Sequence, residues 1–278
     1  MAHFKMTQKT TSKLLLSIFV LTLVSLGVLI TMGNVNVDKL PIEKTERQLR
    51  VISMNVSADN VLPTSLQDNL IKTQPDIIVV IEWTGNNLDL NKFSKAGYQT
   101  ILNHPRKKVH GICVLSKLKG ISTIIEAPIK THCTLPLGQF RFKWQDKYFS
   151  LFAIHAPPPV PSCKGTTSKY LEAIADWVDN GKLNSNIGIG KKDDIVLMAG
   201  DFNSLSFQNG IESLLKNGLK DKHSKYNFIN PTWKPIKPFP YLARIDYILY
   251  SNELKLSITR RFHIDNSDHL GIMADLNF

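Results

Sequence analysis

The chain has 278 residues, of which 43% are apolar and 21% charged, and this composition excludes a disordered or collagen-like protein. Its three Cys residues are too few to frame a small disulfide scaffold, so the fold must rest on an apolar core. The formal net charge of +11 favours anionic partners such as nucleic acid, phospholipid headgroups or phosphorylated metabolites.

The first element in chain order is an apolar run over residues 14–32, which follows a basic stretch over residues 1–13. The run holds no charged residue, and a helix of this length covers about the 30 Å hydrocarbon thickness of a bilayer. We therefore expect one N-terminal transmembrane helix. Because Lys5, Lys9 and Lys13 precede the run, the positive-inside rule predicts a cytoplasmic N-terminus and an extracytoplasmic domain. No clear cleavage site follows, which favours an uncleaved anchor; a cleaved signal peptide, which would give a secreted domain, is the alternative.

A polar linker over residues 33–48 precedes a domain that we expect over residues 49–278. Continuous apolar runs predict buried strands at 49–55, 76–82, 111–116, 148–155, 194–201 and 244–250. Alternating aromatic and polar residues predict a half-exposed strand at 139–144 that turns into the next one as a hairpin. Apolar spacing predicts helices at 64–73, 167–180 and 209–217. This order indicates an α/β fold in which mixed sheets are sandwiched between helices.

The three cysteines fall in different settings. Cys113 lies in an apolar run and is expected to be buried. Cys133 and Cys163 lie among Pro and Thr in loop-like sequence, and in an exported domain these two could pair. The sequence does not give the separation that a disulfide requires, so both a pair and free thiols remain open.

Polar side chains stand at the ends or interruptions of six apolar runs: Asn55, Glu82, His155, Asp201 with Asn203, Asp246, and Asp268 with His269. Ligands of α/β proteins gather at strand ends, although each of these residues alone also fits a turn, a solvated strand end or hydrogen-bonded scaffold. Asp246 is flanked by apolar residues in a strand that looks buried, where an isolated carboxylate is costly. His269 is its natural candidate partner.

The order of these motifs resembles the endonuclease/exonuclease/phosphatase superfamily, the deoxyribonuclease-I-like and exonuclease-III-like phosphohydrolases. The matching segments are MNV (54–56), IE (81–82), IHAP (154–157), GDFN (200–203), RIDYIL (244–249) and SDH (267–269). The resemblance covers residues 49–278 and implies a four-layered α/β sandwich of two β-sheets flanked by helices. It also implies metal-dependent cleavage of a phosphoester.

The resemblance implies a metal site for one or two Mg²⁺ ions, with Mn²⁺ as the other candidate ion. Glu82 is expected to be the principal ligand, Asn55 to support the metal and phosphate, and Asp268 to be a second ligand. Hard Mg²⁺ selects carboxylate and amide oxygens, which explains these residue types independently.

The remaining site residues receive roles in catalysis from the same resemblance. Asp201 is expected to orient or deprotonate the attacking water, and Asn203 to bond a phosphoryl oxygen. His269, held by Asp246, would stabilise the transition state or activate the nucleophile. His155 would contact the phosphate or assist the leaving group.

Substrate-binding candidates are Trp233 and Lys234, on a Pro-rich loop that the resemblance places over the site, and Arg244. Trp233 could stack on a base, touch a lipid chain, or plug its own loop. The SADNV that follows MNV lacks the acidic residue of the best-known DNA-repair members, and IEW replaces their QE pair, so their substrate does not transfer to this chain. IHAPPPVP and SDHLG are similar to membrane-anchored and exported members.

Three functions from different classes therefore stand open. The first is a membrane-anchored, exported Mg²⁺-dependent nuclease or phosphodiesterase that acts on nucleic acid, which the basic charge favours. The second is the same site acting on a phospholipid or small phosphoester, which an anchor would favour by holding the site near a bilayer. The third is a non-catalytic binding module.

Overall fold

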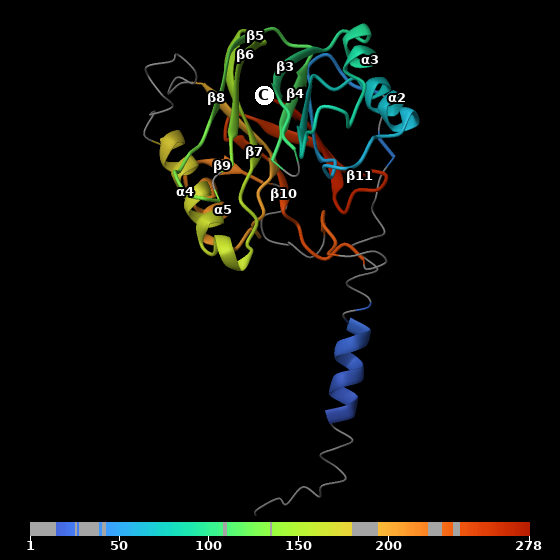
Figure 1. Ribbon diagram of the computed structural model, residues 1–278, viewed down its shortest axis with the longest axis vertical. Coiled ribbons are helices and arrows are strands. Elements are labelled where there is room, and N and C mark those ends of the chain that lie inside the picture. The colour runs from blue at the N-terminus through green and yellow to red at the C-terminus, as the bar shows by residue number, and fades with distance from the viewer. Residues whose placement is uncertain are drawn as a thin grey trace, which may run out of the picture.

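The computed structural model describes residues 15–25, 27, 39–40, 43–107, 110–133, 135–179, 194–221, 230–235 and 240–278. Two six-stranded sheets pack face to face, with α2 and α3 outside one sheet and α4 and α5 outside the other (Figure 1). The four-layered α/β sandwich implied by the resemblance is therefore confirmed.

The first sheet has the order β11-β12-β1-β2-β4-β3. Its strands are β1 (Leu49–Asn55), β2 (Ile77–Ile81), β3 (Gln99–His104), β4 (Ile112–Ser116), β11 (Lys255–His263) and β12 (Leu270–Asn277). β1 and β2 are parallel and every other pair is antiparallel, so the sheet is mixed. The central strands β1 and β2 are buried along their whole length, which explains their continuous apolar runs.

The second sheet has the order β5-β6-β7-β8-β10-β9. Its strands are β5 (Gly120–Glu126), β6 (Leu137–Trp144), β7 (Lys147–His155), β8 (Ile195–Asp201), β9 (Leu219–Lys220) and β10 (Asp246–Ser251). β6 and β7 form the expected hairpin, and only β7 and β8 among the paired strands are parallel. The expectation that the first of these strands is half-exposed was wrong: β6 is buried from Leu137 to Phe142, where the Arg141 guanidinium pairs with the buried Asp194 carboxylate.

Among the described residues from 43 onward there are five helical segments: α2 (Thr64–Lys72), α3 (Leu90–Lys95), α4 (Thr166–Asp179), α5 (Asn209–Lys216) and the short 3₁₀ helix η1 (Pro161–Cys163). The expected strands at 49–55, 76–82, 111–116, 148–155, 194–201 and 244–250 and all three expected helices are present within about two residues. Strands β3, β5, β9, β11 and β12, helix α3 and the short helix η1 were not expected. β3 and β11 are edge strands with exposed residues, so they lack the apolar run that marks a buried strand.

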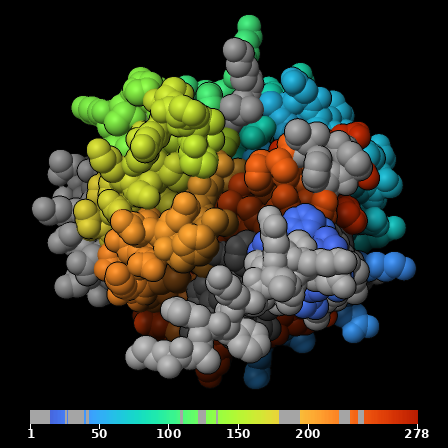
Figure 2. All heavy atoms as spheres, turned by 90° about the horizontal axis from the view of Figure 1, so that it is seen from below, coloured from blue at the N-terminus to red at the C-terminus, as the bar shows by residue number. Residues whose placement is uncertain are grey.

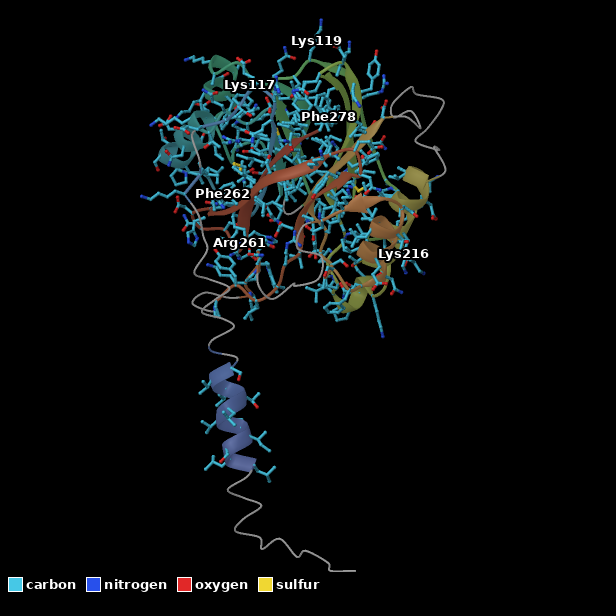
Figure 3. All side chains as sticks on the ribbon, turned by 180° about the vertical axis from the view of Figure 1, so that it is seen from behind. Lys117, Lys119, Lys216, Arg261, Phe262 and Phe278 are labelled. Atoms are coloured by element: carbon cyan, nitrogen blue, oxygen red, sulfur yellow. A yellow bond between two sulfur atoms is a disulfide. The ribbon has the colours of Figure 1, made fainter. Side chains whose placement is uncertain are left out.

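Three apolar clusters hold the layers together. The middle cluster lies between the sheets and contains Phe140, Phe142 and Phe149, with Phe278 packed against it (Figure 3). The other two join each sheet to its own helices. Because all three draw their residues from Leu40 onward, residues 33–278 hold every packed element of the described structure.

Residues 15–25 form a helix whose side chains are all exposed. Among the described residues, no helix reaches the length and hydropathy that a membrane crossing requires. Residues 1–13, and residues 14, 26 and 28–32 of the expected transmembrane run, lie outside the described residues.

The disulfide left open by the sequence is present. Cys133 and Cys163 are bonded, with a Cα–Cα distance of 5.8 Å, and Cys113 is a buried free thiol. The bond ties the connection between β5 and β6 to η1, which follows the Pro-rich segment after His155.

A buried ion pair joins the two neighbouring strands β1 and β12. The Arg50 guanidinium donates to both carboxylate oxygens of Asp275 at 2.7 Å, and both side chains are fully buried. We expect Asp275→Asn to destabilise the fold by about 3 kcal/mol or more, because it leaves the buried Arg50 charge uncompensated. Urea unfolding measures the change.

The matched control is Asp146→Asn, which breaks the solvent-exposed Lys143–Asp146 pair. An exposed pair contributes little, so the unfolding midpoint should not move. An equal shift in both variants would contradict the assignment of the large effect to burial.

Candidate active site

The topology brings the polar strand ends to one edge of the sandwich. β1 and β2 are parallel, with Asn55 opposite Ile81, so Asn55 and Glu82 leave the first sheet side by side. In the second sheet, Asp201 stands opposite both His155 and Asp246. The sheets face each other, so both sets of side chains meet in one place.

Glu82 and Asp268 present carboxylates on one side of this place. Glu82 accepts hydrogen bonds from Asn55 Nδ2 at 3.0 Å and from the Ala58 N–H at 3.0 Å. Asp268 accepts from Ser57 Oγ at 2.9 Å and from Trp233 Nε1 at 3.0 Å. Burial raises the pKa of Glu82, opposed by the Asn55 hydrogen bond. A poorly solvated carboxylate beside a second one suits a divalent cation, and oxygen donors suit Mg²⁺.

Three non-glycine residues after strand ends have left-handed backbone: Ser57 (φ 59°), Glu82 (φ 62°) and Asn203 (φ 46°). This conformation is unfavourable for residues other than Gly and Asn, and it persists only where the surroundings enforce it. The backbone of Glu82 is held from both sides, because its neighbour Trp83 bonds to Gly111 and Arg106. Strain of this kind at Ser57 and Glu82, which follow the ends of the neighbouring strands β1 and β2, indicates a functional site.

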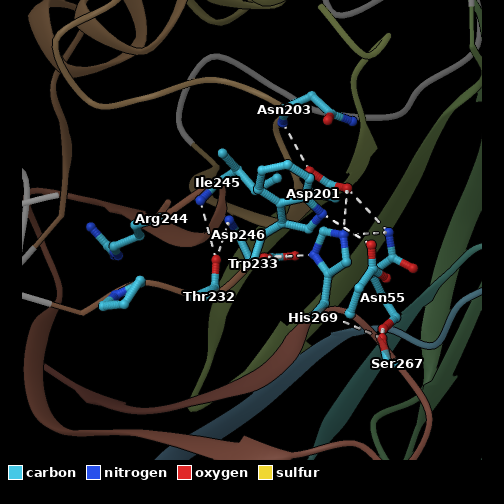
Figure 4. Close-up of polar contacts among 12 residues, drawn as sticks. Asn55, Asp201, Asn203, Thr232, Trp233, Arg244, Ile245, Asp246, Ser267 and His269 are labelled. Atoms are coloured by element: carbon cyan, nitrogen blue, oxygen red, sulfur yellow. Dashed lines mark hydrogen bonds and ion pairs between the residues drawn. The ribbon is translucent and has the colours of Figure 1, made fainter. Parts of the chain in front are cut away.

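His269 lies at the centre of the polar network (Figure 4). Its Nδ1 is 2.9 Å from Asp246 Oδ2, and its Nε2 is 3.8 Å from Asp201 Oδ2 and 3.5 Å from Asn55 Nδ2. Although burial alone lowers the pKa of His269, the carboxylates of Asp246 and Asp201 raise it to about 10. The imidazole is therefore cationic at neutral pH. The expected Asp246–His269 contact is present.

Asp201 is almost fully buried and accepts from Asn55 Nδ2 at 3.1 Å and from the Asn203 N–H at 2.9 Å. Burial raises its pKa to about 7, against the opposing effect of His269. The ligand atoms of Asp201, Asp246 and His269 lie within 4.8 Å of one another, which is also compatible with a divalent cation. Asn203 is anchored by its own side chain, which donates to the Ala156 carbonyl at 2.9 Å.

His155 is buried beside this group, with its Nε2 4.0 Å from Asp201 Oδ2. Burial and the neighbouring imidazoles of His110 and His269 lower its pKa to about 3, so the ring is neutral at physiological pH. The His110 ring lies 6.4 Å from that of His155, between ring centroids. His110 was missed by the sequence analysis, because it precedes strand β4 rather than following a strand.

Glu82, Asp268, Asp201, Asn203, His155, His110 and His269 line one pocket of about 510 Å³, whereas Asn55 and Asp246 lie behind its lining residues. Its lining residues are Glu82, His110, His155, Pro158, Pro159, Val160, Asp201, Asn203, Ser204, Leu205, Gln208, Trp233, Ala243, Ile245, Asp268 and His269. Figure 2 views the face where the yellow segment around α4, the orange segments after β8 and the red C-terminal segments meet.

The three substrate-binding candidates have different positions. Trp233 lines the pocket, where its indole N–H binds Asp268. Lys234 places its ammonium 4.6 Å from the centre of the Tyr241 ring and does not line the pocket.

Arg244 is buried and does not line the pocket either. Its guanidinium forms a two-pronged ion pair with Asp221, with Nη2 2.7 Å from Oδ1, and stacks on the Tyr247 ring. With these partners Arg244 supports the loop before β10 rather than a substrate.

Hydroxyl side chains that the sequence analysis did not select hold the loops in place. Thr232 Oγ1 accepts from the N–H groups of Ile245 and Asp246, both at 3.1 Å. Ser267 Oγ donates to the Asn55 carbonyl at 2.9 Å and accepts from the His269 N–H at 3.0 Å. These bonds fix the Trp233 loop and the His269 loop against β10 and β1, and no sequence pattern marks them.

A model of the endonuclease/exonuclease/phosphatase family matches residues 34–269 of the chain. No curated protein sequence is significantly similar to it.

Solved structures share the fold. TDP2 of D. rerio, complexed with single-strand DNA product, has a TM-score of 0.66 and 18% identity over 84% of this chain and 100% of its own. The 3'-5' exonuclease NExo from Neisseria meningitidis has a TM-score of 0.63 and 16% identity, over 82% and 100%. The mannosyl-6-phosphatase Bt3783 of Bacteroides thetaiotaomicron has a TM-score of 0.58 and 17% identity, over 83% and 100%.

Proposed function

Because the chain belongs to the endonuclease/exonuclease/phosphatase family, it is a metal-dependent hydrolase of phosphoester bonds, and we propose that water attacks the phosphorus of its substrate in the pocket above Asp201 and His269. The observation that carries this proposal is the meeting of Glu82, Asp268, Asp201 and His269 at one pocket. These side chains come from both sheets.

A divalent metal ion would be held by Glu82 and Asp268 with support from Asn55, and Mg²⁺ suits these oxygen ligands. When bound, it would neutralise phosphate charge and polarise the phosphoryl group. Asn55 would give this support by orienting the Glu82 carboxylate, since its amide N–H groups donate to Glu82 and Asp201 while its Oδ1 accepts from the Ser57 N–H.

Asp201 is the best-placed group to take a proton from the attacking water. Its pKa of about 7 is matched to that task at neutral pH, and the Asn203 N–H fixes the orientation of its carboxylate. Asn203 lines the pocket and retains a second amide hydrogen for a phosphoryl oxygen.

His269 stabilises negative charge that develops on the phosphoryl group. With a pKa of about 10, the imidazole is a cation at neutral pH. A protonated imidazole cannot accept a proton as a base, but it can stabilise an anionic transition state. His155, with a pKa of about 3, contributes neutral hydrogen bonding near the leaving group instead of a proton.

We expect His110→Ala to lower kcat/KM by about 10-fold to 100-fold, mainly through KM, because the imidazole lines the pocket and can donate to an anionic substrate. Steady-state kinetics measures the changes in kcat and KM separately. His263→Ala, at an exposed position of β11 outside the pocket lining, is the control. If KM and kcat are unchanged in His110→Ala, then His110 does not contact the substrate.

Two substrate classes fit the proposed function. Nucleic acid is supported by the net charge of +11 and by the solved D. rerio TDP2 complex with DNA product. A phospholipid or small phosphoester is supported by the apolar part of the pocket lining, which includes Pro158, Pro159, Leu205 and Ile245.

The deciding experiment incubates the purified chain with plasmid DNA, RNA, sphingomyelin, phosphoinositide and nucleotides, in Mg²⁺ and in EDTA. We expect hydrolysis of at least one phosphoester that EDTA abolishes and Mg²⁺ or Mn²⁺ restores. Absence of metal-dependent turnover on every substrate would favour a binding module and contradict the proposal.

We also propose that residues 14–32 anchor the chain in a membrane with residues 49–278 outside the cytoplasm. This is supported by the uncharged run, the three preceding lysines and the exposed apolar side chains of residues 15–25. Reporters fused after Phe278 test it: a reporter active only outside the cytoplasm should work, and activity from a cytoplasm-specific reporter alone would refute the orientation.

A further inference from the structure

One buried side chain, Asn87, joins the loops that follow β1 and β2. We refer to residues 57–60 as the β1 loop and to residues 83–88 as the β2 loop, which comes directly after Glu82. Asn87 lies in the β2 loop, is 1% exposed and does not line the pocket. Its sequence context, TGNNL, indicates only a turn, so no sequence pattern separates it from its neighbour Asn86.

The amide nitrogen of Asn87 reaches into the β1 loop. Nδ2 lies 2.8 Å from the Asn60 carbonyl oxygen, 3.1 Å from that of Ala58 and 3.4 Å from that of Ser57. Carbonyl oxygens that converge inside a protein need a donor, because a buried acceptor without one loses its hydration and gains nothing. Asn87 is that donor, and it holds the β1 loop closed.

The amide oxygen of Asn87 holds the β2 loop. Oδ1 accepts from the Thr84 N–H at 2.7 Å and from Thr84 Oγ1 at 3.0 Å. Thr84 Oγ1 also lies 3.3 Å from the Ala58 carbonyl oxygen, and the Asn87 carbonyl accepts from the Leu62 N–H at 2.7 Å. Both ends of the Asn87 side chain are therefore used, one in each loop.

The two loops that Asn87 joins hold the carboxylates of the proposed metal site. The Ala58 N–H donates to Glu82 Oε2 at 3.0 Å, and Ser57 Oγ donates to Asp268 Oδ1 at 2.9 Å. Thr84 follows Glu82 by two residues, so its bond to Asn87 fixes the chain just beyond that carboxylate. A shift of one loop against the other would change how the two carboxylates face each other.

Asn87 also explains how strained backbone persists on both sides of it. Ser57 and Glu82 have left-handed backbone, with φ of 59° and 62°. This conformation is unfavourable for both residue types and needs support from its surroundings. The bonds of Asn87 fall on Ser57 and Ala58 in the β1 loop and on Thr84 in the β2 loop, within two residues of each strained position.

We infer that Asn87 is a positioning residue: it locks the β1 loop onto the β2 loop and so sets how Glu82 and Asp268 present their carboxylates to a metal ion. It acts through Ala58 and Ser57. This inference rests on the proposed function, because it concerns the metal site of the same pocket. Partners behind the ligands typically change metal affinity by about 10-fold to 100-fold.

The main variant is Asn87→Ala in the full-length chain. We expect calorimetric titration with Mg²⁺ to show an affinity about 10-fold lower or worse, and kcat at saturating Mg²⁺ to return close to the wild-type value, because the ligands themselves are intact. In the metal-free protein, NMR should show that the Ala58 amide proton exchanges with solvent about 10-fold faster or more, because its bond to Glu82 opens more often.

The matched control is Gln67→Ala. Gln67 is another buried amide with both ends bonded: Nε2 donates to the Leu62 carbonyl at 2.8 Å, and Oε1 accepts from the Asp89 N–H at 2.9 Å. Neither partner belongs to the β1 loop or the β2 loop. We expect Gln67→Ala to lower the urea unfolding midpoint as Asn87→Ala does, but to leave the Mg²⁺ affinity and the Ala58 exchange rate unchanged.

A milder pair of variants separates positioning from folding. Thr84→Val removes the hydroxyl that bonds to Asn87 Oδ1 and lies near the Ala58 carbonyl, with little change in volume. We expect it to lower the Mg²⁺ affinity about 3-fold, as one neutral hydrogen bond would. Thr84→Ser restores the hydroxyl and should restore the affinity. This pair decides the inference if Asn87→Ala does not fold.

The remaining outcomes each decide one proposal. Wild-type Mg²⁺ affinity in Asn87→Ala overturns the inference, even if Ala58 exchanges faster, because Asn87 would then hold the loops without affecting the site. An equal loss of affinity in Gln67→Ala also overturns it, since general destabilisation would explain both. If wild type binds no Mg²⁺, the proposed metal site is wrong, and the exchange rate of Ala58 in the metal-free protein still shows whether Asn87 positions Glu82.

Discussion

His269→Ala is expected to lower kcat by about 10²-fold to 10⁴-fold, the range typical for a group that acts directly on the reacting atoms. The imidazole is buried between Asp246 and Asp201, and it lines the pocket as a cation at neutral pH. Ala removes this charge where the transition state carries the most negative charge. Single-turnover kinetics with Mg²⁺ present reports the chemical step.

Asp246→Asn should also lower kcat, because Asp246 acts on the reaction through His269. The amide keeps the shape and the hydrogen-bond reach to Nδ1, but it removes the nearest carboxylate, so the pKa of His269 should fall. NMR titration of the His269 ring gives that pKa directly. If Asp246 had only a structural role, its substitution would lower activity without changing the pKa of His269.

The double variant Asp246→Asn, His269→Ala decides whether the two residues act as a unit. Residues that depend on each other are non-additive, so the double variant should be little worse than His269→Ala alone. Losses that multiply would show that the pair does not work together, despite the 2.9 Å contact.

Glu82→Gln is expected to lower the affinity for Mg²⁺ by about 100-fold or more and to lower activity in parallel, since even loss of an outer-shell partner costs 10-fold to 100-fold. The change removes the charge but keeps the volume. The Gln carbonyl oxygen can still accept from the Asn55 amide or the Ala58 N–H, so the fold should persist. Calorimetric titration with Mg²⁺ measures the affinity.

The control for Glu82→Gln is Glu253→Gln, an exposed carboxylate in the turn after β10. It should leave both Mg²⁺ affinity and activity unchanged. Wild-type affinity in Glu82→Gln would exclude Glu82 as the principal ligand, and activity restored by high Mg²⁺ would show that the remaining ligands still form the site.

The sequence by itself indicated most of the buried strands and most of the polar residues that the structure brings to the pocket. Strands β1, β2, β7 and β8 are covered on both faces, so burial leaves a continuous apolar run that ends abruptly at Asn55, Glu82, His155 and Asp201. Such a polar residue after an apolar run is visible without any tertiary information. The edge strands β3 and β11 are half exposed, carry no such run, and were missed for that reason.

Only the tertiary structure decided which polar residues share the pocket, because their proximity depends on strand direction. β4 is antiparallel to β2, with Ile112 opposite Ile81, so the start of β4 lies beside the end of β2 and brings His110 into the pocket. A rule that examines only strand ends cannot find such a residue. Arg244 precedes β10, whose first residue Asp246 belongs to the site, yet its guanidinium forms an ion pair with Asp221 instead of facing the pocket. Partners from distant parts of the chain follow from strand pairing and packing that no local pattern of residues encodes. Asp221 reaches Arg244 because β9 pairs with β10 in the second sheet, and Trp233 reaches Asp268 because its loop lies against the segment before β12.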